Sequence, residues 1–191
     1  MSRFTLTDLP VPGVRLVQRQ AREDSRGFFS RLFCAQELAD AGWRGHVAQI
    51  NHTHTREPGS VRGLHFQRPP HGEIKLVSCL AGAVWDVVVD LRPTSPSYMR
   101  WHAEVLSADN RHALLIPEGV AHGFQTLSDD VQLLYLHSHP YTPEAEDGLN
   151  PKDDRLAIAW PLPITAMSER DRHHPMLDQR PELWGISAPK T

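Results

Sequence analysis

Short runs of β-branched, aromatic and other apolar residues recur along the chain, and turn signals rich in proline and glycine separate them. Runs of this length and composition are typical of β-strands. The strands that this pattern predicts lie at 14–17, 28–33, 47–51, 74–80, 84–91, 98–106, 112–116 and 131–137. One helix is predicted at 35–41, because Gly42 follows it as a suitable C-terminal residue.

The spacing of these strands favours an all-β fold of the sandwich or barrel type. From Pro161 onwards the strand rhythm is lost and polar residues are more frequent, so turns and short helices are expected to pack over the barrel there. No internal repeat, low-complexity tract or charge run marks a linker. We therefore expect a single domain over residues 1–191.

The composition narrows the possible partners and the compartment. A formal net charge of −3 argues against non-specific binding of nucleic acid, which needs clustered basic residues. No apolar stretch approaches the roughly 20 residues of a membrane span, and the first residues do not read as a signal peptide. Cys34 and Cys79 are too few for a disulfide framework, so a reduced, cytoplasmic setting is expected.

One segment concentrates polar groups that could carry chemistry. Arg62, His65 and Gln67 occupy a probable strand, and Lys75 follows the next turn. The period of two in a strand puts His65 and Gln67 on the same face as Gly63, whereas Arg62 faces away. A bulge at Gly63 would bring Arg62 to the same side.

Further candidates lie in three later segments. His122 follows the Pro-Glu-Gly turn of I-P-E-G-V-A-H-G-F at 116–124, and Tyr135 lies in the last predicted strand. Asp171 ends the string S-E-R-D, which could equally be a helix start capped by Ser168. A histidine, a tyrosine and an aspartate suffice for acid–base chemistry. The remaining candidate histidines are expected at the surface: His46, His52, His54, His71, His102, His112, His173 and His174.

Histidines on successive hairpins also raise the possibility of a cupin-type metal site. Such sites commonly use two histidines spaced H-x-H and a glutamate, whereas this chain has Gln67 two residues after His65. The next acid, Glu73, falls in a turn, so His65 and His122 are the only good donors in these segments. We expect no bound metal, and a metal-dependent cupin enzyme stays as the alternative.

Many strings in the same order give the chain a family resemblance. They are D-S-R-G-F-F at 24–29, Q-I-N at 49–51, R-G-L-H-F-Q at 62–67, K-L-V at 75–77, D-V-V-V-D-L-R at 86–92, S-P at 95–96, I-P-E-G-V-A-H-G-F at 116–124, Y-L-H-S-H-P-Y at 135–141, W-P at 160–161 and S-E-R-D at 168–171. The chain resembles the dTDP-4-dehydrorhamnose 3,5-epimerases of deoxysugar biosynthesis. The resemblance implies a cupin or jelly-roll β-barrel with a few short peripheral helices, and a cytoplasmic homodimer.

The resemblance also implies catalytic roles for four residues. His65 would remove the proton beside the ketone, and Asp171 would orient its ring and stabilise the imidazolium. Lys75 would stabilise the enolate at the C4 oxygen. Tyr135 would return a proton to the opposite face of the sugar ring. No cofactor is implied.

Seven further positions match substrate contacts of the family, some of which come from the partner subunit: Arg26, Phe29, Gln49, Asn51, Arg62, His122 and Tyr141. The two arginines match contacts to the diphosphate, which a planar guanidinium can grip through two oxygens. The aromatic residues match nucleotide contacts. The chain departs from the family pattern at Arg31, which replaces a glutamate, and at Asp153–Asp154, where Asp-Pro is usual.

The expected activity is epimerisation at C3 and C5 of a dTDP-linked 4-keto-6-deoxyhexose, without a cofactor. A C3-only epimerase acting on a related nucleotide-linked sugar is the close alternative. From other classes, a metal-dependent cupin enzyme and a non-catalytic module that binds sugar nucleotides stay open. Neither nucleic acid nor a membrane is expected as a partner.

Overall fold

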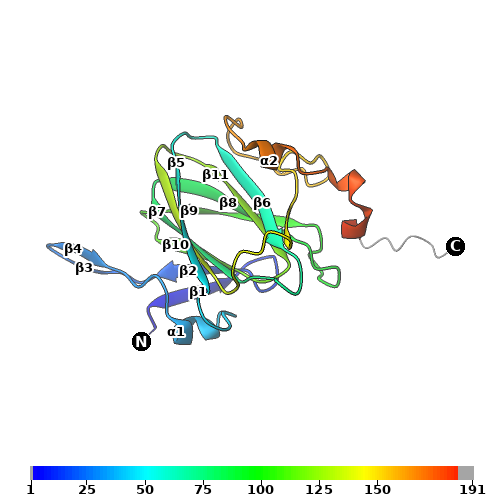
Figure 1. The fold of residues 1–191 in the computed structure, drawn as a ribbon. Coiled ribbons are helices and arrows are strands. Elements are labelled where there is room, and N and C mark those ends of the chain that lie inside the picture. Colours follow the sequence, from blue (N-terminus) through cyan, green and yellow to red (C-terminus); the bar gives the residue numbers. More distant parts are fainter. Residues whose placement is uncertain (1, 185–191) are drawn as a thin grey trace.

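The computed structural model describes residues 2–184, which form two antiparallel β-sheets stacked as a sandwich (Figure 1). The first sheet has the strand order β1 (Phe4–Asp8), β2 (Arg15–Arg19), β10 (His112–Ile116), β7 (Lys75–Ala81), β12 (Val131–His137) and β5 (Gln49–Thr55). The second has the order β13 (Glu146–Gly148), β6 (Val61–Gln67), β11 (Val120–Thr126), β8 (Ala83–Asp90) and β9 (Trp101–Ser107).

The main core lies between the two sheets, because the inward-facing residues of their central strands are apolar. Val77 and Leu133 of the first sheet pack in one buried cluster with Val88, Leu106 and Phe124 of the second. This burial is the dominant stabilising contribution, at about 25 cal/mol for each square ångström of apolar surface removed from water. The strand pattern of the sequence therefore encodes the sandwich.

Both sheets are also covered on the outside. Helix α1 (Ala35–Ala39) buries Leu38 against the outer face of the first sheet, where Leu76 and Leu115 lie. The segment from Leu149 to Leu177 covers Val87 and Val89 of the second sheet. A central strand that is buried on both faces has a nearly continuous apolar sequence, as residues 84–91 do.

A two-stranded hairpin, β3 (Arg22–Asp24) and β4 (Gly27–Phe29), projects away from the sandwich on the side of α1 (Figure 1). Its residues are exposed. The C-terminal part of the described chain carries the short helices α2 (Glu169–Arg172), η1 (Leu177–Gln179) and η2 (Pro181–Trp184). They confirm the turns and short helices expected beyond Pro161.

The all-β jelly-roll prediction is confirmed, as a sandwich of two sheets without a closed barrel. The strand predicted at 28–33 is wrong beyond Phe29, because the hairpin ends there. The strand predicted at 98–106 begins at Trp101. The helix predicted at 35–41 ends at Ala39, and Gly42 follows with a φ of 108°.

No strand was predicted at β1, β3, β11 or β13. Strands β1 and β13 lie at sheet edges, whereas β11 (Val120–Thr126) is central in the second sheet and carries His122. Within residues 2–184, no helix has the length and apolar character needed to cross a membrane.

Candidate active site

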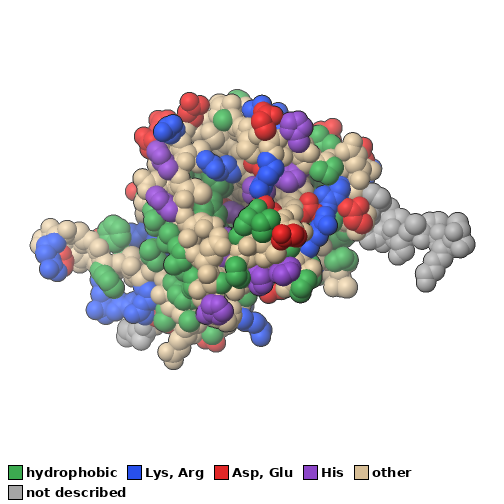
Figure 2. Space-filling view, viewed as in Figure 1, with side chains coloured by type: hydrophobic (Ala, Val, Ile, Leu, Met, Phe, Trp, Pro, Cys, Tyr) green, Lys and Arg blue, Asp and Glu red, His purple; other side chains and the backbone are tan. Residues whose placement is uncertain are grey.

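A pocket of about 710 Å³ is lined by strands of both sheets, β5, β7 and β12 of the first and β6 and β11 of the second. Figure 2 shows histidine, basic and acidic side chains gathered around this hollow. Nine of the eleven predicted site residues line it: Gln49, Asn51, Arg62, His65, Lys75, His122, Tyr135, Tyr141 and Asp171. The fold therefore brings together residues that are spread over more than a hundred positions of the sequence.

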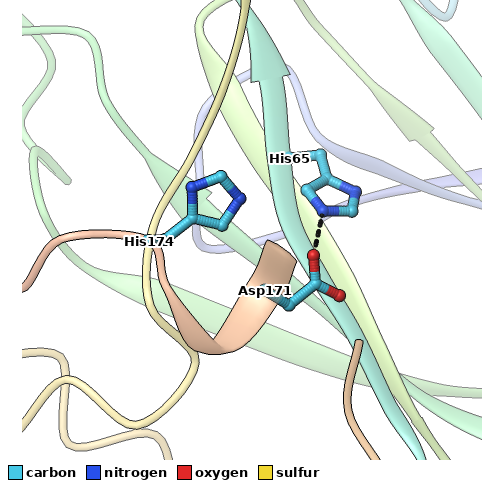
Figure 3. A group of neighbouring side chains, drawn as sticks. All are labelled: His65, Asp171 and His174. Atoms are coloured by element: carbon cyan, nitrogen blue, oxygen red, sulfur yellow. Dashed lines mark hydrogen bonds and ion pairs between the residues drawn. The ribbon is translucent and has the colours of Figure 1, made fainter. Parts of the chain in front are cut away.

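His65 and Asp171 form a hydrogen-bonded pair at the wall of the pocket (Figure 3). His65 Nε2 lies 2.8 Å from Asp171 Oδ1, and the Gly63 amide donates to Oδ2 at 3.3 Å. Burial acts to raise the pKa of Asp171, but the hydrogen bond and positive charge of His65 lower it below its ordinary value. The aspartate is therefore ionised and can hold the imidazole in one orientation.

Helix α2 places Asp171, and the string S-E-R-D both starts a capped helix and brings Asp171 to His65. Ser168 caps the helix by accepting a hydrogen bond from the Asp171 amide at 3.0 Å. The same turn directs the Asp171 carboxylate toward β6. Because the cap fixes the first turn of α2, it also fixes the partner of His65.

A bulge in β6 places Arg62 and His65 in the same pocket, as the sequence predicted. In the pairing of β6 with β11, His65 lies opposite His122, whereas Arg62 lies opposite Phe124. The register therefore shifts between His65 and Arg62, which marks the bulge. Gly63 lies in this bulge with a φ of 120°, and a Cβ there would stand 2.5 Å from the Gly123 Cα. Only glycine fits such a conformation at such close approach.

His122 is bound to a carboxylate that the sequence did not single out. Its Nε2 lies 2.9 Å from Asp86 Oδ1, and both side chains are buried. Burial raises the pKa of Asp86, while His122 and Lys75 act to lower it. An acid inside the apolar run at 83–90 was the available sequence signal, because a buried carboxylate requires a partner.

Lys75 belongs to a second network that the sequence did not predict. Its Nζ lies 3.1 Å from Glu73 Oε1 and donates to the His65 carbonyl oxygen at 3.1 Å. The other oxygen of Glu73 lies 2.9 Å from His137 Nδ1. Glu73 does lie in a loop, as expected, but its side chain lines the pocket.

Tyr135 projects from β12 between two histidine rings. Its ring centroid lies 5.9 Å from that of His122, edge to face, and 6.2 Å from that of His137, nearly parallel. Burial and the negative charge of Asp86 raise its pKa, against the effects of Thr53 and Arg62. The hydroxyl is therefore protonated over the physiological range and can act as an acid.

The polar residues of β5 border the pocket next to Tyr141. Gln49 donates to Asn51 Oδ1 at 3.0 Å and accepts from the Tyr141 amide at 3.0 Å. The Tyr141 hydroxyl donates to Glu146 at 2.6 Å. Arg62 donates through Nε to the Thr55 hydroxyl at 3.1 Å. These groups form a polar rim beside the acid–base residues.

Arg26 and Phe29 do not reach the pocket of their own chain. Both lie on the projecting β3–β4 hairpin, where Phe29 is 68% exposed. Arg26 forms an exposed ion pair with Asp24 at 2.7 Å. Arg31, which replaces the family glutamate, pairs with Glu37 of α1 away from the pocket.

The prediction that His174 lies at the surface is wrong, because this residue is half-buried. Its ring packs against Gly148 and lies 6.0 Å from the ring of His65 (Figure 3). Donor atoms of His65, Asp171 and His174 lie within 4.8 Å of one another, and among residues 2–184 this is the group that could hold a metal ion. The predicted donors His65 and His122 instead use their Nε2 atoms on two different carboxylates.

Known proteins are similar to this chain over most of its length. Residues 8–179 match a family model described as dTDP-4-dehydrorhamnose 3,5-epimerase. An enzyme of that name from Streptomyces griseus is 42% identical over 169 residues, which cover 87% of this chain and 84% of the relative. A dTDP-4-dehydrorhamnose 3-epimerase from Streptomyces niveus is 40% identical over 168 residues, which cover 87% of this chain and 81% of the relative.

A solved structure shares the fold at similar coverage. It is a dTDP-6-deoxy-D-glucose-3,5-epimerase from Legionella pneumophila, in complex with dTDP-4-keto-L-rhamnose. The TM-score is 0.88 at 33% identity, over 94% of this chain and 96% of that chain. The chain therefore belongs to the dTDP-4-dehydrorhamnose 3,5-epimerase family.

Proposed function

We propose that this protein epimerises C3 and C5 of a dTDP-linked 4-keto-6-deoxyhexose without a cofactor. The observation that carries the proposal is a histidine–carboxylate pair, His65 with Asp171, in the same pocket as a protonated tyrosine, Tyr135. A base and an acid in one pocket are what inversion at a carbon requires.

His65 is the base in this proposal, and its hydrogen bond defines which nitrogen acts. Because Nε2–H donates to Asp171, the lone pair lies on Nδ1. Nδ1 takes the proton from the carbon beside the C4 ketone, and the carbon–hydrogen bonding electrons form the enolate. The charge of Asp171 stabilises the imidazolium that results.

Lys75 and Tyr135 complete the reaction. The Lys75 ammonium stabilises the negative charge that develops on the C4 oxygen, a contribution on the order of 3 kcal/mol for one well-placed donor. The Tyr135 hydroxyl then donates a proton to the opposite face of the carbon, which inverts it. The His65 imidazolium then releases its proton to solvent, and the Tyr135 phenolate takes one from solvent before the next cycle.

The polar rim supplies the binding groups. Arg62 binds the diphosphate, Gln49 and Asn51 lie near the base and sugar, and Tyr141 contacts the nucleotide. Support comes from their shared position in the lining of the pocket, where the hydrogen bonds of Gln49 join it to Asn51 and Tyr141. The bound dTDP-4-keto-L-rhamnose of the Legionella relative supports a substrate of this class.

A homodimer completes the site in this proposal, through the β3–β4 hairpin. Arg26 and Phe29 lie on that hairpin, outside their own pocket, and Phe28 and Phe29 are 62% and 68% exposed. Aromatic exposure of this extent is typical of a contact surface. The hairpin of one subunit would then reach the pocket of the other.

Mixed variants test the sharing of residues. Inactive His65→Asn and weakened Arg26→Ala subunits, unfolded and refolded together, should regain activity. One pocket of each mixed dimer then has an intact His65 and an intact hairpin. Sedimentation should report a dimer. Failure of the mixture to exceed the sum of the separate variants would contradict a shared site.

The reaction itself is tested by NMR with a dTDP-4-keto-6-deoxyglucose substrate in deuterated water. Deuterium should enter at C3 and C5, and His65→Asn should abolish entry at both carbons. Deuterium at C3 alone would identify the 3-epimerase alternative. Binding of the nucleotide sugar without any exchange would identify a non-catalytic module.

The metal-dependent alternative has its own test. Activity should survive a chelator, and elemental analysis should find no stoichiometric iron, manganese or zinc. Loss of activity with chelator, restored by one of these metals, would favour the alternative.

We place the protein in the cytoplasm, on the ground that Cys34 and Cys79 are both free thiols.

A further inference from the structure

Glu73 links Lys75 to His137 inside the pocket, and the proposed reaction gives it no role. It lies in the loop between β6 and β7, with only 9% of its side chain exposed. Lys75 and His137 are directly opposed on β7 and β12, so their side chains share one face of the sheet. Glu73 lies between the two and contacts both.

Each oxygen of the carboxylate has its own partner. Oε1 lies 3.1 Å from Lys75 Nζ, and Oε2 lies 2.9 Å from His137 Nδ1 and 3.4 Å from Gln67 Nε2. Burial acts to raise the pKa of Glu73, yet the bonds from His137 and Lys75 lower it below its ordinary value. Glu73 is therefore a buried negative charge beside a buried lysine.

The pair matters because the ammonium of Lys75 is itself buried, with 7% of its side chain exposed. A buried amine without a counter-ion loses its proton readily, because its charged form is poorly solvated. A neutral amine stabilises an enolate far less than an ammonium does. Glu73 is thus placed to maintain the charge that the reaction uses.

We propose that Glu73 is a positioning residue, which keeps Lys75 protonated and aimed at the C4 oxygen while His137 secures its second oxygen. This inference rests on the proposed function. It extends the acid–base set by one ion pair that acts through Lys75 and does not touch the substrate. The hydrogen bond to Glu73 also gives a role to His137, which lies two residues after the proposed acid, Tyr135, on β12.

The variant Glu73→Gln tests the proposal, because it keeps the size and hydrogen-bonding capacity of the side chain and removes its charge. The measurement is the rate of deuterium entry at saturating substrate, given as the ratio of variant to wild type from pH 6 to pH 9. The ratio should fall about tenfold between these limits, as the unpaired amine loses its proton. KM should change little, since none of the residues proposed to bind the substrate is hydrogen-bonded to Glu73 itself, which bonds to Lys75, His137 and Gln67.

Other titrating groups near Lys75 are present in both proteins, so their common effects cancel in the ratio. They are His65 from β6, Asp86 from β8, His122 from β11, and Tyr135 and His137 from β12. Strand β10, which pairs with β7 at Lys75, contributes the apolar Ile116 there.

Glu104→Gln is the matched control. Glu104 pairs with a histidine, His102, at 2.8 Å on β9, outside the pocket. Its ratio should stay flat over the same pH range.

Glu73→Asp separates charge from position. It keeps the negative charge but shortens the arm, so its rate should fall by a similar factor at every pH. Should Glu73→Gln not fold, as judged by near-ultraviolet circular dichroism, an unchanged rate for Glu73→Asp would still overturn the proposal.

A flat ratio for folded Glu73→Gln would show that the ion pair serves the fold alone. Absence of exchange in the wild type would instead refute the proposed function, so the two failures are distinguishable.

Discussion

His65 and Asp171 are 106 residues apart in sequence, yet their side chains meet at 2.8 Å. The contact joins a strand of the second sheet to the first turn of a four-residue helix. A helix this short gains little stability from its own hydrogen bonds, so its position depends on the Ser168 cap and on packing against the sheet. The orientation of the base therefore depends on the C-terminal segment.

Asp171→Asn should reduce deuterium exchange about 100-fold while changing KM little, because the amide can still bond to His65 but cannot stabilise the imidazolium. The rate is measured by NMR in deuterated water. Ser168→Ala separates position from charge, since it keeps the Asp171 carboxylate but removes the cap, and it should lower the free energy of unfolding by about 1 kcal/mol with a smaller loss of activity. Equal loss of activity in both variants would mean that the placement of Asp171 by the cap limits the rate as much as its charge does.

Tyr135→Phe should separate exchange from inversion. The variant lacks only the hydroxyl, so His65 can still remove a proton and return deuterium to the same face. Recovered substrate should gain deuterium while epimerised product falls about 100-fold. Both are followed in one NMR experiment. Parallel loss of exchange and inversion would place Tyr135 in a different role.

Gly63→Ala should be much more costly than Gly27→Ala. Their φ angles are 120° and 128°, so a side chain strains the backbone at both. A Cβ at Gly63 would stand 2.8 Å from the His122 carbonyl oxygen, whereas one at Gly27 meets nothing within 4 Å. Gly63→Ala should lose a further ~1–3 kcal/mol of unfolding free energy in urea titrations. Equal losses would contradict the bulge geometry.

Asp90 should make stability depend on pH. It accepts bonds from Arg92, Ser95 and Ser97. Burial acts to raise its pKa, but these bonds lower it from 3.8 to about 2. A lowered native pKa gives stability that is present above the unfolded value and is lost as pH falls toward the native one.

Asp90→Asn should therefore lower the free energy of unfolding by about 1–2 kcal/mol at pH 7. The difference from wild type should shrink between pH 4 and pH 2, because Asp90 then becomes neutral in the wild type as well. Urea titrations at several pH values measure it. Asp109→Asn, at an exposed turn, should stay within about 0.5 kcal/mol of wild type. A difference that is constant with pH would exclude the ionic contribution.

The sequence alone identified most of the residues that line the pocket, because they lie in short strings that resemble a known family. The bulge at Gly63 followed from the need to bring Arg62 and His65 to one side, and the strand at 112–116 was predicted at its observed bounds. Asp86, Glu73 and His137 were missed. Each is a single polar residue in or beside a strand, and its importance lies in a partner far away in sequence.

The sequence by itself determined the β-class, and its motifs pointed, through the family that they resemble, to the residues proposed as base and acid, since apolar periodicity and local motifs are properties of short segments. Only the tertiary structure decided which carboxylates His122 and His137 bind, namely Asp86 and Glu73. It also placed Arg26 and Phe29 outside their own pocket. The physical reason is that a buried charge is satisfied by whichever group the folded chain brings within about 3 Å, and sequence spacing does not set that distance.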